Sequence, residues 1–442
     1  MLSPKLLIEG QKPLEGRVRV GGSKNAADYA LAACLLSGEE CVLENVPEIE
    51  DVRLMAGILS ALGAEVENRG GGVWHVRAGN VQRYEAPNEL VVNQRASFLV
   101  MGPLLGRFGE AACCSPGGDV IGTRPLDVHI AGFRALGAQV SRRGQQYLAE
   151  TRDRSRLRGS RIFLDYPSAT GTMNVLFASV LAQGETTIVN AASEPEIADV
   201  AAMLNEMGAR IDGAGHSIIR VEGVPELHGV RHRVIPDRLE AGFFALATAA
   251  TRGETLIEGV ALEHLDALLY KMRESGVALQ SGGDELRVAV GDGGSYRAVQ
   301  AQAVPYPGFA TDLQPTLAAF VTQCRGVSVI QERVYENRLL YIGELRKLGA
   351  DVITAGQTAI VTGPTQLYGT LVRALDVRAG GALVLAALAA EGETEISDSY
   401  HIDRAYEDLV GKLRGLGATI SRAQDEPFEA ARQDPFSGAR KE

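Results

Sequence analysis

The 442-residue chain lacks long apolar runs, has few cysteines and carries no excess of basic charge. No apolar run reaches the roughly 18 residues that a membrane-spanning helix needs, which argues against a membrane span. The N-terminus shows no long apolar core of a secretion signal. Its 44 basic residues are outnumbered by 55 acidic ones, and a net charge of −11 argues against a general nucleic-acid binder. A basic cleft for an anionic metabolite is compatible with this balance.

The cysteines and histidines show no metal-binding pattern. The five cysteines are odd in number and include no Cys-x-x-Cys pair, so we expect reduced thiols in a cytoplasmic protein. Only His228 and His232 have a helical i, i+4 spacing. Gly229, Pro225 and Pro236 argue against a helix there, and no acid or cysteine completes a ligand set. The sequence therefore predicts no metal and no cofactor.

One pattern recurs six times along the chain, at a spacing of roughly seventy residues. Each copy begins with a small-residue apolar helix, continues with a strand and an amphipathic helix, and ends in a strand pair. In the first copy, Val52, Met55 and Leu59 share one face of the second helix. A glycine after each second helix predicts a C-cap in the left-handed region. The six glycine segments are Leu62-Gly-Ala64, Leu136-Gly-Ala138, Met207-Gly-Ala209, Ser275-Gly-Val277, Leu348-Gly-Ala350 and Leu416-Gly-Ala418.

A single copy is too small to bury both of its helices, so the copies must pack together. We predict an α/β fold of two domains, each with three βαβαββ-type repeats around a pseudo-threefold axis and with the first helices turned inward. One domain spans 22–233 and carries a mobile loop at about 113–125, and the other combines 1–21 with 234–422. The strand Arg17–Gly21 would complete the second domain. Residues 423–442 are predicted to be a flexible tail.

The stretch Ser115–His129 carries the most chemistry per residue. Gly117 and Gly118 free the backbone, and Asp119 stands at the tip of the loop that they form. Arg124 begins an amphipathic run, which predicts a place at a helix N-terminus. A guanidinium beside free backbone N–H groups is a good anion site. The alternative is a surface turn with a salt-bridged arginine.

Basic residues also stand at the predicted starts of several first helices, where a cation opposes the helix dipole unless an anion arrives. Lys24, Arg95 and Arg378 break the local rule in this way, as residues at functional sites often do. If the domains face each other, these ends converge with Arg124 on one site for a strongly anionic ligand. The alternative is that each is a solvated surface charge.

Two carboxylates stand near these basic groups, Asp119 on the loop and Asp312 at a turn-rich lead into a helix. Two acids in one cationic cleft allow the general-acid and general-base roles to be divided. For Asp312 the alternative is an ordinary acid in the first turn of a helix.

Eight motifs together resemble those of one enzyme family. They are Gly21-Gly-Ser-Lys-Asn-Ala26, Arg95-Ala-Ser97, Pro116–His129, Glu194-Pro-Glu-Ile197, Pro236–Glu240, Thr311–Gln314, Tyr335–Arg338 and Tyr400–Arg404. With them the chain resembles the UDP-N-acetylglucosamine enolpyruvyl transferases from about Pro4 to Arg422. The resemblance implies a two-domain inside-out α/β barrel with three repeats in each domain, in agreement with the six copies.

The resemblance also implies an activity and a set of site residues. The enolpyruvyl group of phosphoenolpyruvate would move to the 3′-hydroxyl of UDP-N-acetylglucosamine with release of phosphate, the first committed step of peptidoglycan synthesis. Asp119 would be the general acid and Asp312 the base, with Lys24 and Arg378 also catalytic. Phosphoenolpyruvate would be held by Lys24, Arg124, Arg378 and Arg404. The other implied substrate-binding residues are Asn25, Arg95, Pro125, Leu126, Asp127, Val128, Tyr166, Ser168, Ala169, Val334 and Arg338.

The main departure from the family is Asp119, because most members have a cysteine at this position. An aspartate cannot form the thioether adducts of a cysteine, so we expect an active enzyme that is insensitive to fosfomycin. Asp28-Tyr29 and Gly380-Gly381 also depart from the expected pattern. Two alternatives stay open: an enzyme like 5-enolpyruvylshikimate-3-phosphate synthase, and a catalytically silent paralogue that binds UDP-N-acetylglucosamine.

Overall fold

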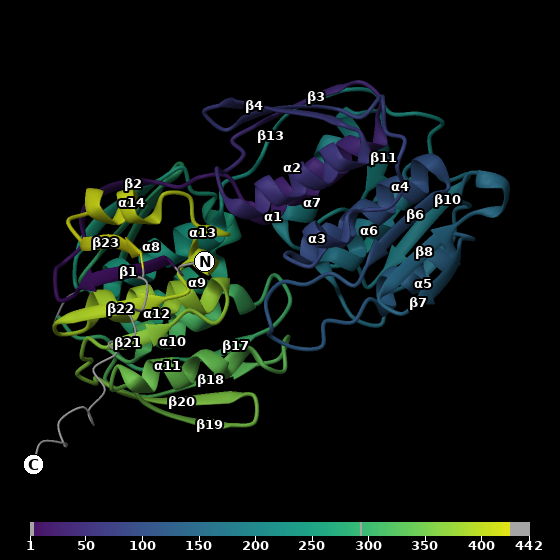
Figure 1. Cartoon of the computed structure of the whole chain (residues 1–442). Coiled ribbons are helices and arrows are strands. Elements are labelled where there is room, and N and C mark those ends of the chain that lie inside the picture. The colour runs from purple at the N-terminus through teal and green to yellow at the C-terminus, as the bar shows by residue number, and fades with distance from the viewer. Residues whose placement is uncertain (1–3, 292–293, 425–442) are drawn as a thin grey trace, which may run out of the picture.

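The computed structural model describes residues 4–291 and 294–424. These residues form two lobes, shown in Figure 1, and each lobe contains three units of one type. Units 1 to 3 form the first lobe and units 4 to 6 the second. No helix within the described ranges is long and apolar enough to cross a membrane.

The units of the first lobe share the order helix, strand, helix and strand pair. Unit 1 contains α1 (Lys24–Ala33), η1 (Cys34–Leu36), β3 (Glu40–Glu44), α2 (Glu50–Leu62), β4 (Glu65–Gly70) and β5 (Val73–Arg77). Unit 2 contains α3 (Asn88–Val91), η2 (Arg95–Val100), α4 (Met101–Phe108), β6 (Glu110–Cys114), α5 (Asp127–Ala135), β7 (Gln139–Arg143), β8 (Gln146–Glu150) and η3 (Arg152–Arg154). Unit 3 contains β9 (Arg161–Phe163), α6 (Ala169–Ser179), β10 (Glu185–Val189), α7 (Pro195–Glu206), β11 (Arg210–Asp212), β12 (Ile218–Glu222) and β13 (Arg231–Arg233).

The second lobe repeats this order and adds two strands from the N-terminus. Unit 4 contains α8 (Arg238–Ala250), β14 (Glu254–Glu258), η4 (Leu262–His264), α9 (Asp266–Ser275), β15 (Ala278–Gly282) and β16 (Glu285–Ala289). Unit 5 contains β17 (Gln300–Ala303), η5 (Thr311–Leu313), α10 (Gln314–Val321), β18 (Gly326–Glu332), η6 (Arg338–Tyr341), α11 (Ile342–Lys347), β19 (Asp351–Ala355) and β20 (Thr358–Gly363). Unit 6 contains β21 (Leu371–Arg373), α12 (Val377–Ala389), β22 (Glu393–Ser397), α13 (Tyr400–Asp403), α14 (Leu409–Gly415) and β23 (Thr419–Gln424), and the N-terminal strands are β1 (Pro4–Glu9) and β2 (Glu15–Arg19).

Each unit receives a strand that leaves its predecessor in the same lobe. β9, β17 and β21 lead in from the preceding units and pair in parallel with β10, β18 and β22, the strands that follow the first helices of units 3, 5 and 6. β13 leaves unit 3 and pairs in parallel with β3 of unit 1, which closes the ring of the first lobe. In unit 2 a bridge between Glu85 and Ala112 takes the place of this strand.

The N-terminal strands close the ring of the second lobe, where Figure 1 shows them beside the C-terminal elements. β1 lies between β22 and β23 and is antiparallel to both, in the position that a hairpin strand of unit 6 would take. β2 then pairs in parallel with β14 of unit 4, as β13 does with β3. The chain therefore enters the first lobe after β2 and returns to the second lobe after β13.

The first helices of the units form the interior of each lobe. α8, α10 and α12 pack against one another in the second lobe, and α4 packs against α6 in the first. Small side chains permit this close approach. The alanines that we predicted to lie inside are fully buried: Ala30, Ala32, Ala33, Ala245, Ala247 and Ala249.

The predicted glycine caps are confirmed in all six units. The φ angles are 108° at Gly63, 96° at Gly137, 100° at Gly208, 95° at Gly276, 98° at Gly349 and 90° at Gly417. Each value lies in the left-handed region that glycine adopts without steric cost. The glycines therefore end the second helices and turn the chain into the strand pairs.

Gly380 and Gly381 serve a packing role that the sequence pattern did not reveal. A Cβ atom on Gly380 would lie 2.6 Å from Cγ1 of Ile402, and one on Gly381 would lie 2.5 Å from the Tyr406 hydroxyl. The pair therefore allows α12 to lie directly against the segment 402–406, which carries Arg404.

Two hydrophobic clusters divide the chain. One extends from Ala26 to Val234, and the other combines Leu6–Val20 with Leu239–Ile420. On this division we propose the domain boundaries 22–233 for the first lobe and 1–21 with 234–422 for the second.

Three local predictions need correction. β6 extends to Cys114, so the predicted loop begins at residue 115 and ends where α5 begins at Asp127. Arg124 lies in this loop, outside the helix, with a φ of 42°. The ring of Pro125 disfavours the helical conformation for the residue that precedes it. Ala423 belongs to β23 and pairs with Lys5. Past Gln424, the predicted tail lies outside the described residues.

Candidate active site

A cavity of about 450 Å³ lies between the two lobes. Its walls come from the start of α1, the loop before α5 and the segment 166–170 in the first lobe, and from segments 304–312, 334–338 and 377–378 in the second. The predicted site residues that line it are Lys24, Asn25, Arg95, Asp119, Arg124, Pro125, Tyr166, Ser168, Ala169, Asp312, Val334, Arg338, Arg378 and Arg404. Residues far apart in the sequence therefore meet at one place.

Lys24 is the first residue of α1, and two carboxylates neutralise it. Its Nζ lies 2.9 Å from Oδ2 of Asp51 and 3.3 Å from Oδ2 of Asp28. Its backbone N–H donates to Asp237, which also caps α8 across the lobe boundary. Burial opposes the charge of Lys24, but Asp51 and Asp28 more than offset this effect and raise its pKa. The amine therefore stays cationic although only 12% of its side chain is exposed.

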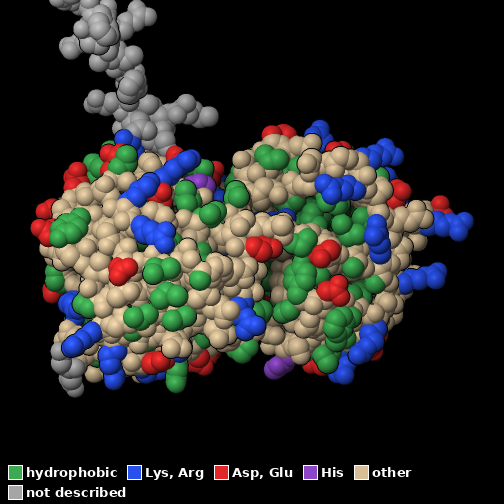
Figure 2. All heavy atoms as spheres, turned by 90° about the horizontal axis from the view of Figure 1, so that it is seen from below, with side chains coloured by type: hydrophobic (Ala, Val, Ile, Leu, Met, Phe, Trp, Pro, Cys, Tyr) green, Lys and Arg blue, Asp and Glu red, His purple; other side chains and the backbone are tan. Residues whose placement is uncertain are grey.

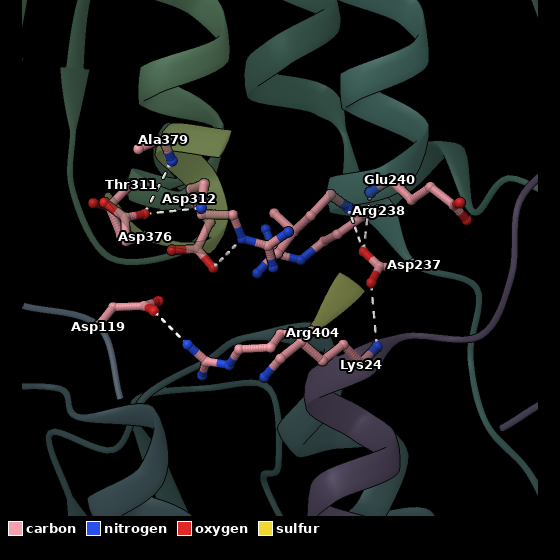
Figure 3. Close-up of polar contacts among 12 residues, drawn as sticks. Lys24, Asp119, Asp237, Arg238, Glu240, Thr311, Asp312, Asp376, Ala379 and Arg404 are labelled. Carbon is pink, nitrogen blue, oxygen red and sulfur yellow. Dashed lines mark hydrogen bonds and ion pairs between the residues drawn. The ribbon is translucent and has the colours of Figure 1, made fainter. Parts of the chain in front are cut away.

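Arg404 joins the lobes through two carboxylates, as Figure 3 shows for Asp119. Its Nη1 donates to Asp119 at 2.8 Å, while Nε and Nη2 donate to the two oxygens of Asp51 at 2.8 and 3.3 Å. Asp51 is fully buried in the first turn of α2 and was not among the predicted site residues. The available signal was an acid within an otherwise apolar buried face of a helix.

Asp312 lies between two guanidinium groups. Oδ1 accepts from Nη2 of Arg338 at 2.8 Å, and Oδ2 accepts from Nε of Arg378 at 3.1 Å. Burial disfavours its charge, but Arg378 and Arg338 outweigh burial and hold the pKa of Asp312 well below its usual range. Asp376 caps α12 by accepting from the backbone N–H groups of Arg378 and Ala379, which places the Arg378 side chain at the cavity.

The loop before α5 lies closed over the cavity. The Asn337 backbone N–H donates to the Ile121 carbonyl at 2.9 Å, and Glu336 accepts from the Thr123 hydroxyl at 3.0 Å and from its N–H at 3.3 Å. Arg95 holds the end of this loop by donating to the carbonyls of Arg124 and Pro125. Burial and the nearby Arg124 charge lower the pKa of Arg95 to about 10, so it stays cationic at neutral pH.

Glu336→Ala is expected to raise the KM values for both substrates about threefold to tenfold, because it removes two hydrogen bonds that hold the loop closed. Glu336→Gln keeps an acceptor for Thr123 and should stay within about twofold of the wild type. Steady-state kinetics at saturating concentrations of the second substrate would measure both variants. Equal KM values in Glu336→Ala and the wild type would contradict a role of these contacts in closure.

The cavity is positive although the whole chain carries a charge of −11. Seven basic and five acidic side chains line it. Figure 2 shows a face of the two lobes on which basic and acidic side chains are interspersed. Figure 3 shows the long side chains of Lys24, Arg238 and Arg404 extending into one space between the lobes. The arrangement suits a small ligand with several negative charges.

Three predicted binding residues lie outside the cavity lining. Leu126 and Val128 are buried because the start of α5 turns them into the core. Asp127 accepts a hydrogen bond from the Tyr166 hydroxyl at 2.7 Å. Their contact with a substrate stays a prediction. His129 is also a core residue, hydrogen-bonded to Asn174, and burial lowers its pKa to about 3.

Other cavity residues that were not among the predicted site residues are Glu194, Arg238, Tyr335 and Glu336, although each stands within one of the eight motifs. Arg238 is buried and pairs with Glu196 of the other lobe at 3.0 Å. The Tyr335 ring lies below the Arg124 guanidinium, with 5.6 Å between Cζ and the ring centroid. These contacts come from residues that are remote in sequence.

The family comparison agrees with this geometry. A family model described as EPSP synthase (3-phosphoshikimate 1-carboxyvinyltransferase) matches residues 8–413. A UDP-N-acetylglucosamine 1-carboxyvinyltransferase 2 of Carboxydothermus hydrogenoformans is 46% identical over 421 residues, which cover 95% of this chain and 100% of that protein. The chain belongs to the UDP-N-acetylglucosamine 1-carboxyvinyltransferase family. A member from Bacillus subtilis is 44% identical over 428 residues, 96% of this chain and 98% of that protein.

Solved structures show the same fold. The enolpyruvyl transferase NikO from Streptomyces tendae superposes with a TM-score of 0.87 at 27% identity, over 96% of this chain and 100% of that one. EPSP synthase from Acinetobacter baumannii superposes with a TM-score of 0.76 at 17% identity, over 96% of this chain and 100% of that chain, which shows a shared fold alone. The predicted two-domain α/β architecture is confirmed by these matches.

Proposed function

We propose that the protein transfers the enolpyruvyl group of phosphoenolpyruvate to the 3′-hydroxyl of UDP-N-acetylglucosamine and releases phosphate. The observation that carries the proposal is the cationic cavity in which Asp119 and Asp312 face a cluster of basic groups. Relatives at 43–46% identity with the name of this activity support the choice of acceptor. The reaction would supply a precursor for peptidoglycan synthesis.

Phosphoenolpyruvate would bind among Lys24, Arg124, Arg378 and Arg404. Its phosphate and carboxylate need several cationic donors, and three of these four side chains are already held at the cavity by carboxylates. Guanidinium groups pair with phosphate and carboxylate oxygens through two N–H groups at once. The ligand would therefore compete with Asp312 and Asp51 for donors that are in place before it arrives.

UDP-N-acetylglucosamine would occupy the rest of the cavity. The proposed contacts lie at the wall of the cavity or next to it. They are Asn25, Arg95, Arg124, Pro125, Leu126, Asp127, Val128, Tyr166, Ser168, Ala169, Asp312, Val334 and Arg338. Ser168 caps α6 and places the N-terminus of this helix near the cavity, where free N–H groups suit a diphosphate.

Asp119 and Asp312 would divide the proton transfers. Asp119 would take up a proton from solvent as the substrates draw Arg404 away from it, and would deliver that proton to the methylene carbon of phosphoenolpyruvate, which makes the neighbouring carbon electrophilic. Asp312 would accept the proton of the 3′-hydroxyl as its oxygen attacks that carbon. The new methyl group would return a proton to the Asp119 carboxylate, and departure of phosphate would restore the carbon–carbon double bond. Lys24 and Arg378 would stabilise the charge on the leaving phosphate.

The deciding test is phosphate release from the purified protein with phosphoenolpyruvate and one of two acceptors. Release with UDP-N-acetylglucosamine and none with shikimate 3-phosphate is the expected result. Release with shikimate 3-phosphate alone would favour the shikimate-pathway alternative. Release with neither, alongside measured binding of UDP-N-acetylglucosamine, would favour a silent paralogue.

Fosfomycin is expected to leave the wild-type activity unchanged after prolonged incubation, because Asp119 offers no thiolate for alkylation. Asp119→Cys is the matched variant and should lose activity with time in the presence of fosfomycin. Residual activity would be followed with and without prior incubation. Time-dependent inactivation of the wild type would contradict the prediction, since the five cysteines are buried in the structure.

A further inference from the structure

Asp28 is a buried carboxylate beside Lys24 that the proposed mechanism does not use. It lies one turn after Lys24 on α1, and its side chain is 1% exposed. Oδ2 accepts from Lys24 Nζ at 3.3 Å and from Nε2 of Gln94 at 2.8 Å. Oδ1 is buried and lacks a hydrogen-bond partner among the described residues. An unpaired buried oxygen is unfavourable for a charged carboxylate and less so for a neutral acid.

The ion-pair cluster around Lys24 has an excess of negative charge. Lys24 and Arg404 face the three carboxylates of Asp28, Asp51 and Asp119. Asp51 contacts both cations, and Asp119 contacts Arg404. Lys24 is the one cation of this cluster that Asp28 contacts, at 3.3 Å, and Asp28 shares it with Asp51, which lies closer at 2.9 Å. Asp28 is therefore the member whose charge is compensated least.

The other charged groups near Asp28 do not change this balance. α2 packs against α1 and carries Asp51, which is already counted in the cluster. α7 packs against α1 and carries Glu196, which Arg238 neutralises. η2 begins with Arg95, whose guanidinium donates to the loop carbonyls. Burial raises the pKa of Asp28 to about 6 against the attraction of Lys24.

We propose that Asp28 is a positioning residue that takes up a proton from solvent when phosphoenolpyruvate binds beside Lys24. This inference rests on the proposed function. The incoming phosphate ester attracts the Lys24 ammonium and adds negative charge next to Asp28, and both effects favour the neutral acid. The proton binds the carboxyl group, whose Oδ1 has no partner among the described residues. Lys24 can then direct the N–H group released by Asp28 to the ligand while its contact with Asp51 remains.

The proposal gives a measurable proton uptake. A rise of about 2 in the pKa of Asp28 on binding would change it from mostly ionised to mostly protonated at pH 7, an uptake of roughly 0.8 proton per ligand. By linkage, the KM for phosphoenolpyruvate should rise about 25-fold between pH 6 and pH 8 through this group. Asp28→Asn is neutral at every pH and should lack this component.

The experiment is a calorimetric titration of phosphoenolpyruvate into the full chain at pH 7, in two buffers with different heats of ionisation. The wild type should take up about 0.8 proton more per bound ligand than Asp28→Asn. Asp212→Asn is the matched control, because Asp212 is exposed on β11 and outside the cavity, and it should equal the wild type. Equal uptake in the wild type and Asp28→Asn would overturn this inference alone. Absence of binding in every variant would overturn it together with the proposed function.

Gln94→Met provides a second variant with an effect on the same group. In the wild type, the hydrogen bond from Gln94 to Oδ2 of Asp28 favours the ionised carboxylate. Removing this bond should therefore raise the pKa of Asp28 in the free protein. Proton uptake at pH 7 should then fall below that of the wild type, and the rise of KM should begin at a higher pH. A purely structural role would lower the melting temperature or kcat and leave the pH profile of KM parallel to that of the wild type. Parallel profiles in both variants would overturn the proposal.

Discussion

Asp119→Asn is expected to lower kcat by about 10³-fold, because an amide cannot deliver the proton that general acid catalysis requires. Arg404 should stay in place in this variant. Two of its nitrogens donate to Asp51, which is fully buried and independent of the loop. The loss would therefore report on proton transfer more than on the position of the arginine. The measurement is phosphate release at saturating concentrations of both substrates.

A binding measurement and a conservative variant distinguish the loss of proton transfer from a folding defect. Asp119→Asn should bind UDP-N-acetylglucosamine with an affinity within about threefold of the wild type, since Asp119 contacts Arg404 and no predicted nucleotide contact. Asp119→Glu keeps an acid and should recover part of the activity. A kcat of Asp119→Asn within about threefold of the wild-type value would rule out Asp119 as the proton donor.

Asp312→Asn is expected to lower kcat by roughly 10² to 10⁴-fold, because the proton of the attacking hydroxyl loses its acceptor. Two guanidinium groups make Asp312 a weak base in the free protein. Phosphoenolpyruvate would bring negative charge to the same arginines and weaken their hold on the carboxylate. Asp312 would thus become more basic only when the other substrate is bound, which couples substrate binding to the proton transfer.

Stability measurements provide a second readout for Asp312. Arg338 is 1% exposed and loses a charged partner in Asp312→Asn, so the free energy of unfolding at pH 7 should fall by about 2 kcal/mol. The folded-state pKa of Asp312 is depressed, so its contribution is present above the unfolded value of about 3.9 and is lost as pH falls below it. Wild type and variant should therefore converge in stability on acidification. Asp351→Asn, at an exposed position on β19, should match the wild type throughout.

The repeat architecture could be predicted because its determinants are local. A glycine with a positive φ ends each second helix, and these six positions are legible from the sequence. The alanine-rich helices, and the apolar faces formed by residues at helical spacing, likewise follow from the residues of one segment. The position of Arg124 could not be predicted in this way. The helical spacing of its neighbours suggested a helix start, and Pro125 moved that start to Asp127.

The candidate site was predictable in part. Lys24, Arg95 and Arg378 stand at helix starts, where a cation is unfavourable without an anion, and all three line the cavity. What the sequence did not show is that protein carboxylates already neutralise Lys24 and Arg378. Asp51 stands in the first turn of a helix, where an acid is common, and its place on the apolar face was the local sign of its burial.

The repeated units, their caps and the residue types that a site for anionic phosphates needs can all be recognised in the amino-acid sequence. Each of these depends on backbone preferences and side-chain chemistry within a short segment. Which charges meet depends on the packed lobes: Arg404 reaches Asp51 and Asp119, and Asp28 pairs with Lys24 while its Oδ1 lacks a partner among the described residues. Such pairing depends on distance and burial after the lobes have packed, because electrostatic interactions strengthen when water is excluded. The balance of charge at the cavity, and with it the proposed proton uptake, is therefore a property of the folded chain.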